Sequence, residues 1–308
     1  MQILGIGNAI VDVLCKVNDE FLIKNSLTKS TMKLIEEAEL KNLLSGLSIE
    51  NTVSGGSVAN SIVGLSKLGN DVGFVGKISK DNLGEKYEDG LKKENVNFLY
   101  TKKIEPIPTG TCLILITPDS ERTMCTFLGT AGKVNDEDVD SNLVKKAEIT
   151  FLEGYLWDEG EPKKAFDKAI NNANKVAMTL SDIFCVERHK TQFLELVKNK
   201  LDIIFSNEQE ILSLIGSKSF DDAITFAKNL NKNIVITRGE KGAVAINNGE
   251  VAECIAEKNL KIVDLTGAGD LFAAGYLHGI INNLSAKESL SKGTELSAKI
   301  IQKVGARI

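Results

Sequence analysis

Short apolar runs alternate with stretches of helical periodicity along most of the chain. The helical spacing is clearest where apolar residues recur at positions 58, 62, 65 and 68 and glycine follows at 69, which is typical of a helix that ends at a glycine. Strands separated by such helices form mainly parallel sheets, so the pattern predicts an α/β protein. The runs predicted as strands are Gln2–Ile6, Val72–Ser79, Ile149–Tyr155, Lys175–Thr179, Asp202–Phe205, Asn233–Thr237 and Lys261–Val263.

Two segments interrupt this alternation, at residues 13–50 and 98–127. The second contains two β-like runs, Cys112–Thr117 and Arg122–Phe127, which a turn at Pro118-Asp119-Ser120 would join into a hairpin. A few inserted strands form too small a core to stand alone. We therefore expect both segments to pack over the main domain or against a partner.

Composition narrows the class of protein. The 308 residues carry a formal net charge of −5 with the two signs interspersed, which argues against a nucleic-acid-binding surface. The five cysteines are scattered and never spaced as C-x-x-C, so neither a disulfide framework nor a zinc site is expected. Two histidines are too few for a histidine metal site or a Ser-His-Asp triad.

The chain shows no sign of a targeting segment or of division into domains. Its first residues lack a basic stretch followed by a long apolar run, so we expect no signal peptide, no membrane span and a cytoplasmic protein. No Pro-rich or Ser/Gly-rich linker divides the sequence. We therefore expect a single domain over residues 1–308.

Candidate chemistry is concentrated in the glycine-rich turn 264–275. The backbone at Gly267, Ala268 and Gly269 can approach a ligand closely, and the first N–H groups of the following helix have no partner within it. These donors and the helix dipole can hold a phosphate. A carboxylate at this place makes best sense as a general base that takes a proton from an attacking hydroxyl, which points to Asp270. The alternative is an ordinary turn with Asp270 as the helix N-cap.

Two further groups of candidates lie near the N-terminus. Gly55 and Gly56 open the helix around position 58, and Asn60 lies in its first turns. Helix interiors mildly disfavour asparagine, so Asn60 is either a ligand contact or a local cap. Asn8 and Asp12 follow the first predicted strand and are either ligand-binding residues or turn formers.

Later strands also end on polar or glycine residues. Glu153 ends a strand, and open α/β sheets bind ligands beyond the carboxyl ends of their strands, so Glu153 either faces a cleft or is a solvated strand end. Oxygen ligands at Asn207 and Glu210 suit Mg²⁺, although a helix cap also explains Asn207. A last group of candidates comprises Thr237, Gly239 and Gly242. Its glycines either allow the close approach of a nucleotide or form a plain hairpin turn.

These motifs, in this order, resemble those of the ribokinase-like (PfkB) family of carbohydrate and nucleoside kinases. The resemblance rests on Gly-Gly-x-x-x-Asn at 55–60, Asn-x-x-Glu at 207–210, Thr-x-Gly-x-x-Gly at 237–242 and Asp-x-Thr-Gly-Ala-Gly-Asp at 264–270. It implies a three-layer α/β/α sandwich with a mainly parallel sheet. The segments 13–50 and 98–127 would then form a small β lid over the acceptor.

The resemblance also implies a role for each candidate. Gly267, Ala268 and Gly269 would form an anion hole beside the base Asp270. The acceptor would be held by Asp12, Gly55, Gly56, Asn60 and Glu153, and ATP would be contacted by Asn207, Thr237, Gly239 and Gly242. Glu210 would organise Mg²⁺ through water, and Asp264 would help bind a monovalent cation such as K⁺ together with the segment 304–306.

The implied activity is transfer of the γ-phosphoryl group of ATP to a primary hydroxyl of a ribonucleoside, with the 5′-hydroxyl of adenosine as first choice. Segments such as 108–111 and 153–155 are similar to bacterial adenosine-kinase-like and sugar-kinase members. A ribokinase- or fructokinase-type sugar kinase and an inactive nucleotide- or sugar-binding protein stay open as alternatives. The expected partners are small molecules, with no nucleic acid and no membrane, and the expected state is a monomer or a homodimer through the lid.

Overall fold

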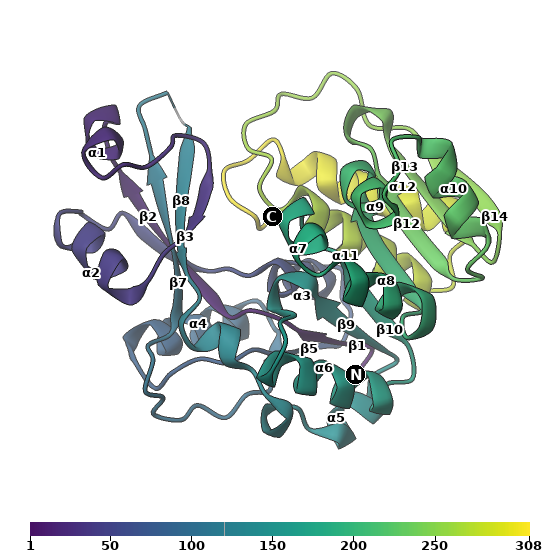
Figure 1. The fold of residues 1–308 in the computed structure, drawn as a ribbon, viewed down its shortest axis with the longest axis horizontal. Coiled ribbons are helices and arrows are strands. Elements are labelled where there is room, and N and C mark those ends of the chain that lie inside the picture. Colours follow the sequence, from purple (N-terminus) through teal and green to yellow (C-terminus); the bar gives the residue numbers. More distant parts are fainter. Residues whose placement is uncertain (120) are drawn as a thin grey trace.

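The computed structural model describes residues 1–119 and 121–308, which form a large lobe and a small lobe (Figure 1). Ser120, expected in a turn, lies outside the described residues. Within the described residues the large lobe is built on a nine-stranded sheet. Its strands, in spatial order, are β14 (Glu250–Cys254), β13 (Ala243–Asn247), β12 (Asn233–Thr237), β11 (Ile203–Asn207), β10 (Val176–Thr179), β9 (Ile149–Glu153), β1 (Ile3–Ile6), β5 (Val72–Val75) and β6 (Asn97–Phe98).

The pairing in this sheet is parallel except at one edge, where β12–β13 and β13–β14 are antiparallel. Parallel strands need crossover connections, and helices supply most of them here. The mainly parallel sheet predicted from the alternating pattern is therefore confirmed. The hairpin at the edge accounts for the turn between Thr237 and Ala243, one of the two alternatives considered for that segment.

Helices cover both faces of the sheet, which explains why the strands are apolar on both sides. Successive strand residues point to opposite faces, so Phe151 belongs to the core on one face and Leu152 to the core on the other. The first face packs against α3 (Ser57–Lys67), α4 (Asn82–Lys93), α11 (Ala268–Ile281) and α12 (Ala286–Ile300). The second packs against α5 (Ser141–Lys146), α6 (Glu161–Asn172), α7 (Ile183–Arg188), α8 (Lys190–Asn199), α9 (Glu208–Ile215) and α10 (Phe220–Lys228).

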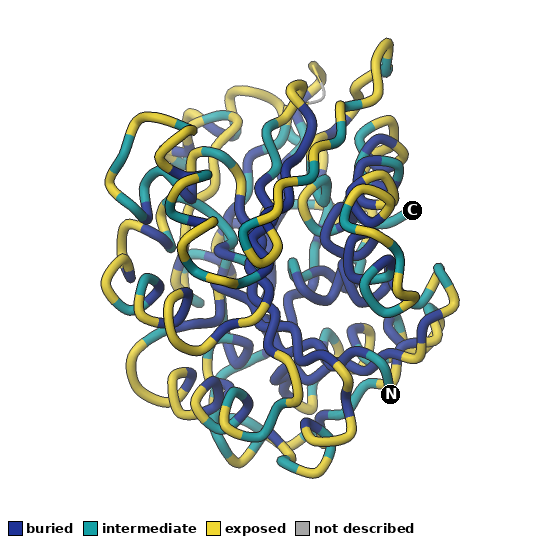
Figure 2. The backbone as a smooth tube through the Cα atoms, turned by 90° about the vertical axis from the view of Figure 1, so that its right-hand side faces the viewer, coloured by how far each residue is buried: buried dark blue, intermediate teal, exposed yellow. Residues whose placement is uncertain are grey.

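This arrangement is the predicted three-layer α/β/α sandwich. Figure 2 shows the central strands and the inner sides of the helices as buried, with exposed residues at the periphery. Helix α3 begins at Ser57 and its capping Leu68 is followed by Gly69, which has a φ of 84°. The helix end predicted at that glycine is therefore correct.

One predicted strand is absent from the described structure. Residues Lys261–Val263 pair with no strand, and the N–H of Val263 donates instead to the carbonyl of Ile301. The run is therefore tied to the segment after α12 and not to the edge strand β14. It belongs to the long connection between β14 and α11.

The small lobe is a second sheet with two helices on its outer side. In the described residues its strand order is β3-β8-β7-β2-β4. The bounds are β3 (Met32–Leu34), β8 (Arg122–Phe127), β7 (Gly110–Ile116), β2 (Ile10–Lys16) and β4 (Asn51–Ser54), with helices α1 (Asp19–Lys24) and α2 (Glu37–Ser45).

The small lobe differs at its boundaries from the segments 13–50 and 98–127 expected from the sequence. Strand β2 begins at Ile10, and the alternation of buried and less buried residues runs from Val11 through Asp12 to Lys16 without a break. Strand β4 extends the sheet to Ser54, whereas Phe98 pairs with β5 in the central sheet. Asp12 is therefore a strand residue and not a turn former.

The two faces of the second sheet have different partners. Val11 and Val13 point outward and share a core with residues of α1 and α2. Ile10 and Leu14 point to the opposite face, in an apolar cluster with Cys112, Ile114 and Met124. Asp12 lies between Ile10 and Leu14 in the strand, so its side chain emerges from this apolar inner face.

Candidate active site

The glycine-rich turn forms the start of α11. Gly267 caps this helix in the left-handed conformation, with a φ of 79°. A Cβ at Gly267 would lie 2.7 Å from the Cα of Ala306, whereas the space beside Gly269 is open. Among the described residues no side chain caps the helix, but the N–H of Ala268 donates to the carbonyl of Leu265 at 3.2 Å. Within the described residues, the N–H groups left without a partner at this N-terminus are therefore those of Gly269 and Asp270.

Asp270 lies in the first turn of α11 and is not its N-cap, since Gly267 takes that position. Its carboxylate accepts hydrogen bonds from Ser57 Oγ at 2.6 Å and from Asn60 Nδ2 at 3.0 Å. Burial raises the pKa of Asp270 to about 6, against the lowering effect of these hydrogen bonds and of Arg307. A carboxylate that titrates near neutral pH and is fixed by two donors is well suited to accept a proton.

The packing of α3 against α11 holds these partners together. A Cβ at Gly64 of α3 would lie 2.8 Å from Leu271, so the two helices approach closely. Ser61 Oγ also donates to the backbone carbonyl of Asp270 at 2.8 Å. Ser57 was not among the residues expected at the site from the sequence, although its place beside the glycine pair that opens α3 was a usable signal.

Asp12 reaches the site from the second sheet. Its carboxylate packs on Gly55, where an added Cβ would lie 2.6 Å from Oδ2. It accepts no hydrogen bond within the described residues, and burial raises its pKa to about 7. Gly56, with a φ of 98°, must be glycine because a Cβ would collide with the carbonyl oxygen of Asn8. The glycine pair thus brings the backbone close to Asp12.

Glu153 does not face the cleft as expected from its position at a strand end. The side chain is 1% exposed, and its two oxygens accept from the N–H of Asn8 at 3.3 Å and of Val58 at 2.9 Å. Burial raises its pKa to about 7. Glu153 therefore ties the loop after β1 to the start of α3, and it positions the residues around Asp12 rather than lying open to a ligand.

Asn60 is engaged at both ends of its amide. Nδ2 donates to Asp270, and Oδ1 accepts from Arg307 Nε at 3.1 Å. The expected contact with an acceptor thus competes with two contacts inside the protein. Arg307, which lies 247 positions from Asn60, was not among the residues expected at the site from the sequence.

The carboxylate of Asp264, expected to bind a monovalent cation, is already paired. It accepts from the N–H and hydroxyl of Thr266 at 3.0 and 2.7 Å and from the N–H of Gly305 at 2.7 Å. Arg122 Nη1, from β8 of the second sheet, lies 2.8 Å from the same carboxylate. With a guanidinium in place, the side chain of Asp264 does not fit a second cation. The ion pair instead fastens the second sheet to the start of α11.

Asn207 and Glu210 form the start of α9. Each side chain accepts from the other's backbone N–H, and Asn207 Nδ2 also donates to Glu210 Oε1 at 2.6 Å. This capping box is one of the two alternatives considered for Asn207. Glu210 is buried, its pKa is raised to about 7 by burial, and Asp182 adds a second negative charge nearby. No salt bridge to it is found among the described residues, so the local charge suits a cation.

The turn after β12 contains two glycines with different roles. Gly239 is exposed and has open space beside it, so a nucleotide can approach its backbone. Gly242 is buried, and a Cβ there would collide with the carbonyl oxygen of Cys254 in β14. Thr237 ends β12 and donates to the carbonyl of Ser206 at 3.5 Å. Of the three candidates in this turn, Thr237 and Gly239 are accessible to a ligand and Gly242 is not.

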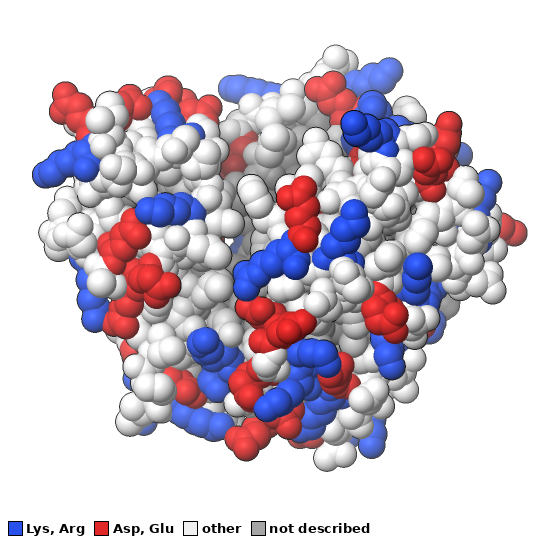
Figure 3. All heavy atoms as spheres, viewed as in Figure 1, with Lys and Arg blue, Asp and Glu red and all other residues white. Residues whose placement is uncertain are grey.

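The candidate residues share one edge of the central sheet. Asn8, Glu153, Asn207 and Thr237 stand at the carboxyl ends of β1, β9, β11 and β12, where open α/β sheets bind ligands. The surface is hollowed between the small lobe and the large lobe, and charges of both signs are spread over this face (Figure 3). The described residues contain no cluster of three or more His, Cys, Asp or Glu side chains arranged for a metal ion.

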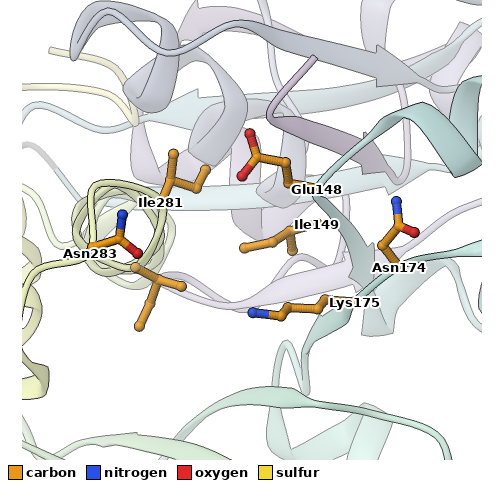
Figure 4. A pocket seen from close by; sticks show the side chains of 7 residues that line it. Glu148, Ile149, Asn174, Lys175, Ile281 and Asn283 are labelled. Carbon is orange, nitrogen blue, oxygen red and sulfur yellow. The ribbon is translucent and has the colours of Figure 1, made fainter.

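A separate hollow of about 370 Å³ lies at the opposite end of the strands (Figure 4). Ile149 begins β9 and Lys175 precedes β10, so both mark the amino ends of these strands. This hollow is outside the candidate active site. In the described part of the chain, no helix is both long and apolar enough to span a membrane.

The three-layer α/β/α fold places a helix N-terminus with open N–H groups beside the buried carboxylate of Asp270, and a helix N-terminus of this kind can accept a phosphate. Residues 30–308 match the family described as "pfkB family carbohydrate kinase", and the chain belongs to this family. The resemblance found in the sequence motifs is thus confirmed.

Similar proteins agree with this membership. The crystal structure of adenosine kinase from Sinorhizobium meliloti is 36% identical, with a TM-score of 0.90, covering 100% of this chain and 95% of that chain. A probable sugar kinase protein from Rhizobium etli CFN 42 is 35% identical, with a TM-score of 0.90, covering 99% and 94%. Adenosine kinase 2 of Arabidopsis thaliana is 28% identical over 332 residues, covering 98% of this chain and 94% of that protein. The predicted ribokinase-like fold is confirmed.

Proposed function

We propose that this kinase transfers the γ-phosphoryl group of ATP to the 5′-hydroxyl of adenosine or a closely related ribonucleoside. The observation that carries the proposal is the carboxylate of Asp270, held by Ser57 and Asn60 beside the open N-terminus of α11. The relatives named adenosine kinase, at 36% and 28% identity, support the choice of acceptor.

The arrangement accounts for the proton and the phosphoryl group separately. The acceptor hydroxyl gives its proton to Asp270 as its oxygen forms a bond to the γ-phosphorus, and the bond from that phosphorus to the bridging oxygen of ATP breaks to release ADP. The N–H groups of Gly269 and Asp270 point out of the first turn of α11 and offset charge on the transferring group. Asp270 therefore needs to be ionised before the reaction, which its pKa of about 6 allows at neutral pH.

The inner face of the second sheet supports a nucleoside over a simple sugar. Asp12 emerges there as a carboxylate without a hydrogen-bond partner among the described residues, which suits ribose hydroxyls. The partly exposed apolar side chains of this cluster include Leu14 and Met124, which pack on the buried Cys112 and Ile114. A heterocyclic base would cover these partly exposed side chains, whereas a sugar alone would leave them facing water.

The nucleotide site follows from the open positions at the strand ends. Asn207, Thr237 and Gly239 would contact ATP, and Glu210 would hold Mg²⁺ through water. When bound, Mg²⁺ neutralises charge on the phosphates during transfer. The buried carboxylate of Glu210, which has no salt-bridge partner among the described residues and lies near the negative charge of Asp182, is the residue of this set that fits such an ion.

A panel of acceptors with Mg-ATP tests the proposal. ADP release and the phosphorylated product are measured for adenosine, inosine, guanosine, ribose and fructose. We expect the highest kcat/KM with adenosine and a product phosphorylated at the 5′ position. A higher kcat/KM with ribose or fructose would instead support the sugar-kinase alternative, which the similarity to the probable sugar kinase of R. etli favours.

A further inference from the structure

We propose that Arg307 is a positioning residue of the active site, which acts through Asn60 to hold the carboxylate of Asp270 in place. The proposal rests on the kinase function proposed above. Arg307 belongs to the last segment of the sequence, and Figure 1 marks this terminus between the two lobes. None of the sequence motifs includes it.

The last segment is fastened to the glycine-rich turn. The N–H of Gly305 donates to Asp264 Oδ2 at 2.7 Å, and Ala306 packs against Gly267 so closely that a Cβ at Gly267 would lie 2.7 Å from its Cα. Lys67 Nζ also donates to the carbonyl of Ile308. Contacts on both sides of Arg307 therefore direct its side chain toward the start of α3.

Arg307 holds the oxygen end of the Asn60 amide. Arg307 Nε donates to Asn60 Oδ1 at 3.1 Å, and this leaves Asn60 Nδ2 to donate to Asp270 Oδ2 at 3.0 Å. A guanidinium only donates hydrogen bonds, so it can pair with the amide oxygen of Asn60 but not with its NH₂ group. The carboxylate of Asp270 only accepts hydrogen bonds, so both contacts favour the same orientation of the amide. Without Arg307 the oxygen of Asn60 loses the contact that fixes its position, and the donor to Asp270 is held less firmly.

An arginine at position 307 destabilises the fold in a way that an apolar side chain would not. Arg307 Nη2 is buried and has no hydrogen-bond partner among the described residues. A buried donor without a partner destabilises the folded state. Apolar side chains would tie down the last segment without this cost, so the guanidinium is better explained by what it does to Asn60 and Asp270.

Arg307 also contributes charge. It lowers the pKa of both Asp12 and Asp270, against the larger raising effect of burial. The charged and titratable groups around Asp270 come from four elements or segments, so their effects must be separated from that of Arg307. They are Asp12 of β2, Glu153 of β9, Tyr155 after β9 and Arg307, with Arg122 of β8 acting on Asp12.

The direct test is the titration of Asp270 by carbon-detected NMR in the wild type, Arg307→Met and Arg307→Lys, with the signal assigned by its loss in Asp270→Asn. In Arg307→Met we expect the pKa of Asp270 to rise by about one unit, because an opposite charge is removed and a donor to the carboxylate is loosened. Arg307→Lys keeps the charge and should show less than half of this rise. The control Lys303→Met removes a positive charge from an exposed site in the same segment and should leave the pKa unchanged.

Kinetics separate positioning from binding. A positioning role predicts that Arg307→Met lowers kcat by about tenfold, which is less than the 10²–10⁴-fold contribution of a general base itself, with the KM for the acceptor changed less than about threefold. A lower acceptor KM would mean that Arg307 blocks the site, and an unchanged kcat and Asp270 pKa would mean that it only packs; either result overturns the proposal. If Arg307→Met does not fold, Arg307→Lys decides through the kcat, which must fall if the planar guanidinium orients Asn60.

The titration needs no acceptor, so the two claims fail in different ways. A wild type that phosphorylates none of the tested acceptors would remove the proposed function, while the pKa of Asp270 in the variants would still decide the role of Arg307. A fully active wild type whose Asp270 pKa and kcat are insensitive to Arg307→Met would leave the function standing and remove the positioning role.

Discussion

Replacing Ser57 by alanine is expected to slow the reaction at neutral pH and to spare it at high pH. Ser57 Oγ donates to Asp270 Oδ1 at 2.6 Å, and Ser57 is the first residue of α3. Alanine is the best helix former, so the substitution should leave the helix in place. The change then removes one donor from the ionised form of the base and little else.

The size of the effect follows from this hydrogen bond. A hydrogen bond to a charged group contributes about 1.5–3 kcal/mol, which corresponds to about one to two pKa units. The pKa of Asp270, about 6 in the wild type, should rise, because the lost donor favoured the charged form. The ionised fraction at pH 7 would then fall by about two- to tenfold, and it would recover as the pH passes the new pKa.

The assay is kcat/KM for the acceptor between about pH 5 and pH 9.5, a window set by the expected pKa range. We expect the acidic limb of the profile to move to higher pH in Ser57→Ala and the plateau at high pH to stay close to that of the wild type. Ser66→Ala is the matched control, because Ser66 lies on the same helix but donates to the carbonyls of Glu94 and Asn95. An acidic limb that stays at the wild-type pH in Ser57→Ala would refute the assignment of this limb to Asp270.

Two further predictions concern the turn and the buried carboxylate. Gly267→Ala should destabilise the protein by about 1–2 kcal/mol or more, since it combines a φ of 79° with a Cβ 2.7 Å from Ala306. Gly269 faces open space, so Gly269→Ala should unfold like the wild type but lose turnover. Equal stability of the two variants in urea would contradict this account. Glu153→Gln should lower the free energy of unfolding by about 1–3 kcal/mol, because the amide nitrogen would face one of the two N–H donors of Asn8 and Val58. It should also raise the acceptor KM more than the ATP KM, and a variant with wild-type stability and KM values would show that the loops do not depend on Glu153.

Local pattern was enough to predict the layers of the fold and the turn at the start of α11. The strands are recognisable because helices on both faces make them apolar throughout, and the helix at Ser57–Lys67 because its apolar positions repeat. The glycines at 267 and 269 and the aspartate at 270 stand together in the sequence, so their spacing alone suggested an anion site with a base.

The contacts that complete the site could not be predicted in this way. The partners Glu153 and Asn8 are 145 positions apart, and Asn60 and Arg307 are 247 positions apart. The sequence around Asn60 does not indicate that Arg307 is its partner, and the sequence around Arg307 does not indicate Asn60. For the same reason Glu153 was expected in the cleft and Asp264 was expected to be free for a cation, whereas backbone N–H groups and Arg122 occupy their oxygens.

The most direct test of the central claim is single-turnover phosphoryl transfer to adenosine by Asp270→Asn, with nucleoside and ATP binding measured in parallel. The amide keeps the shape of the side chain but cannot take the proton. We expect the transfer rate to fall by about 10²–10⁴-fold, while both dissociation constants change little. A transfer rate within about threefold of the wild type would contradict the role of Asp270 as the base.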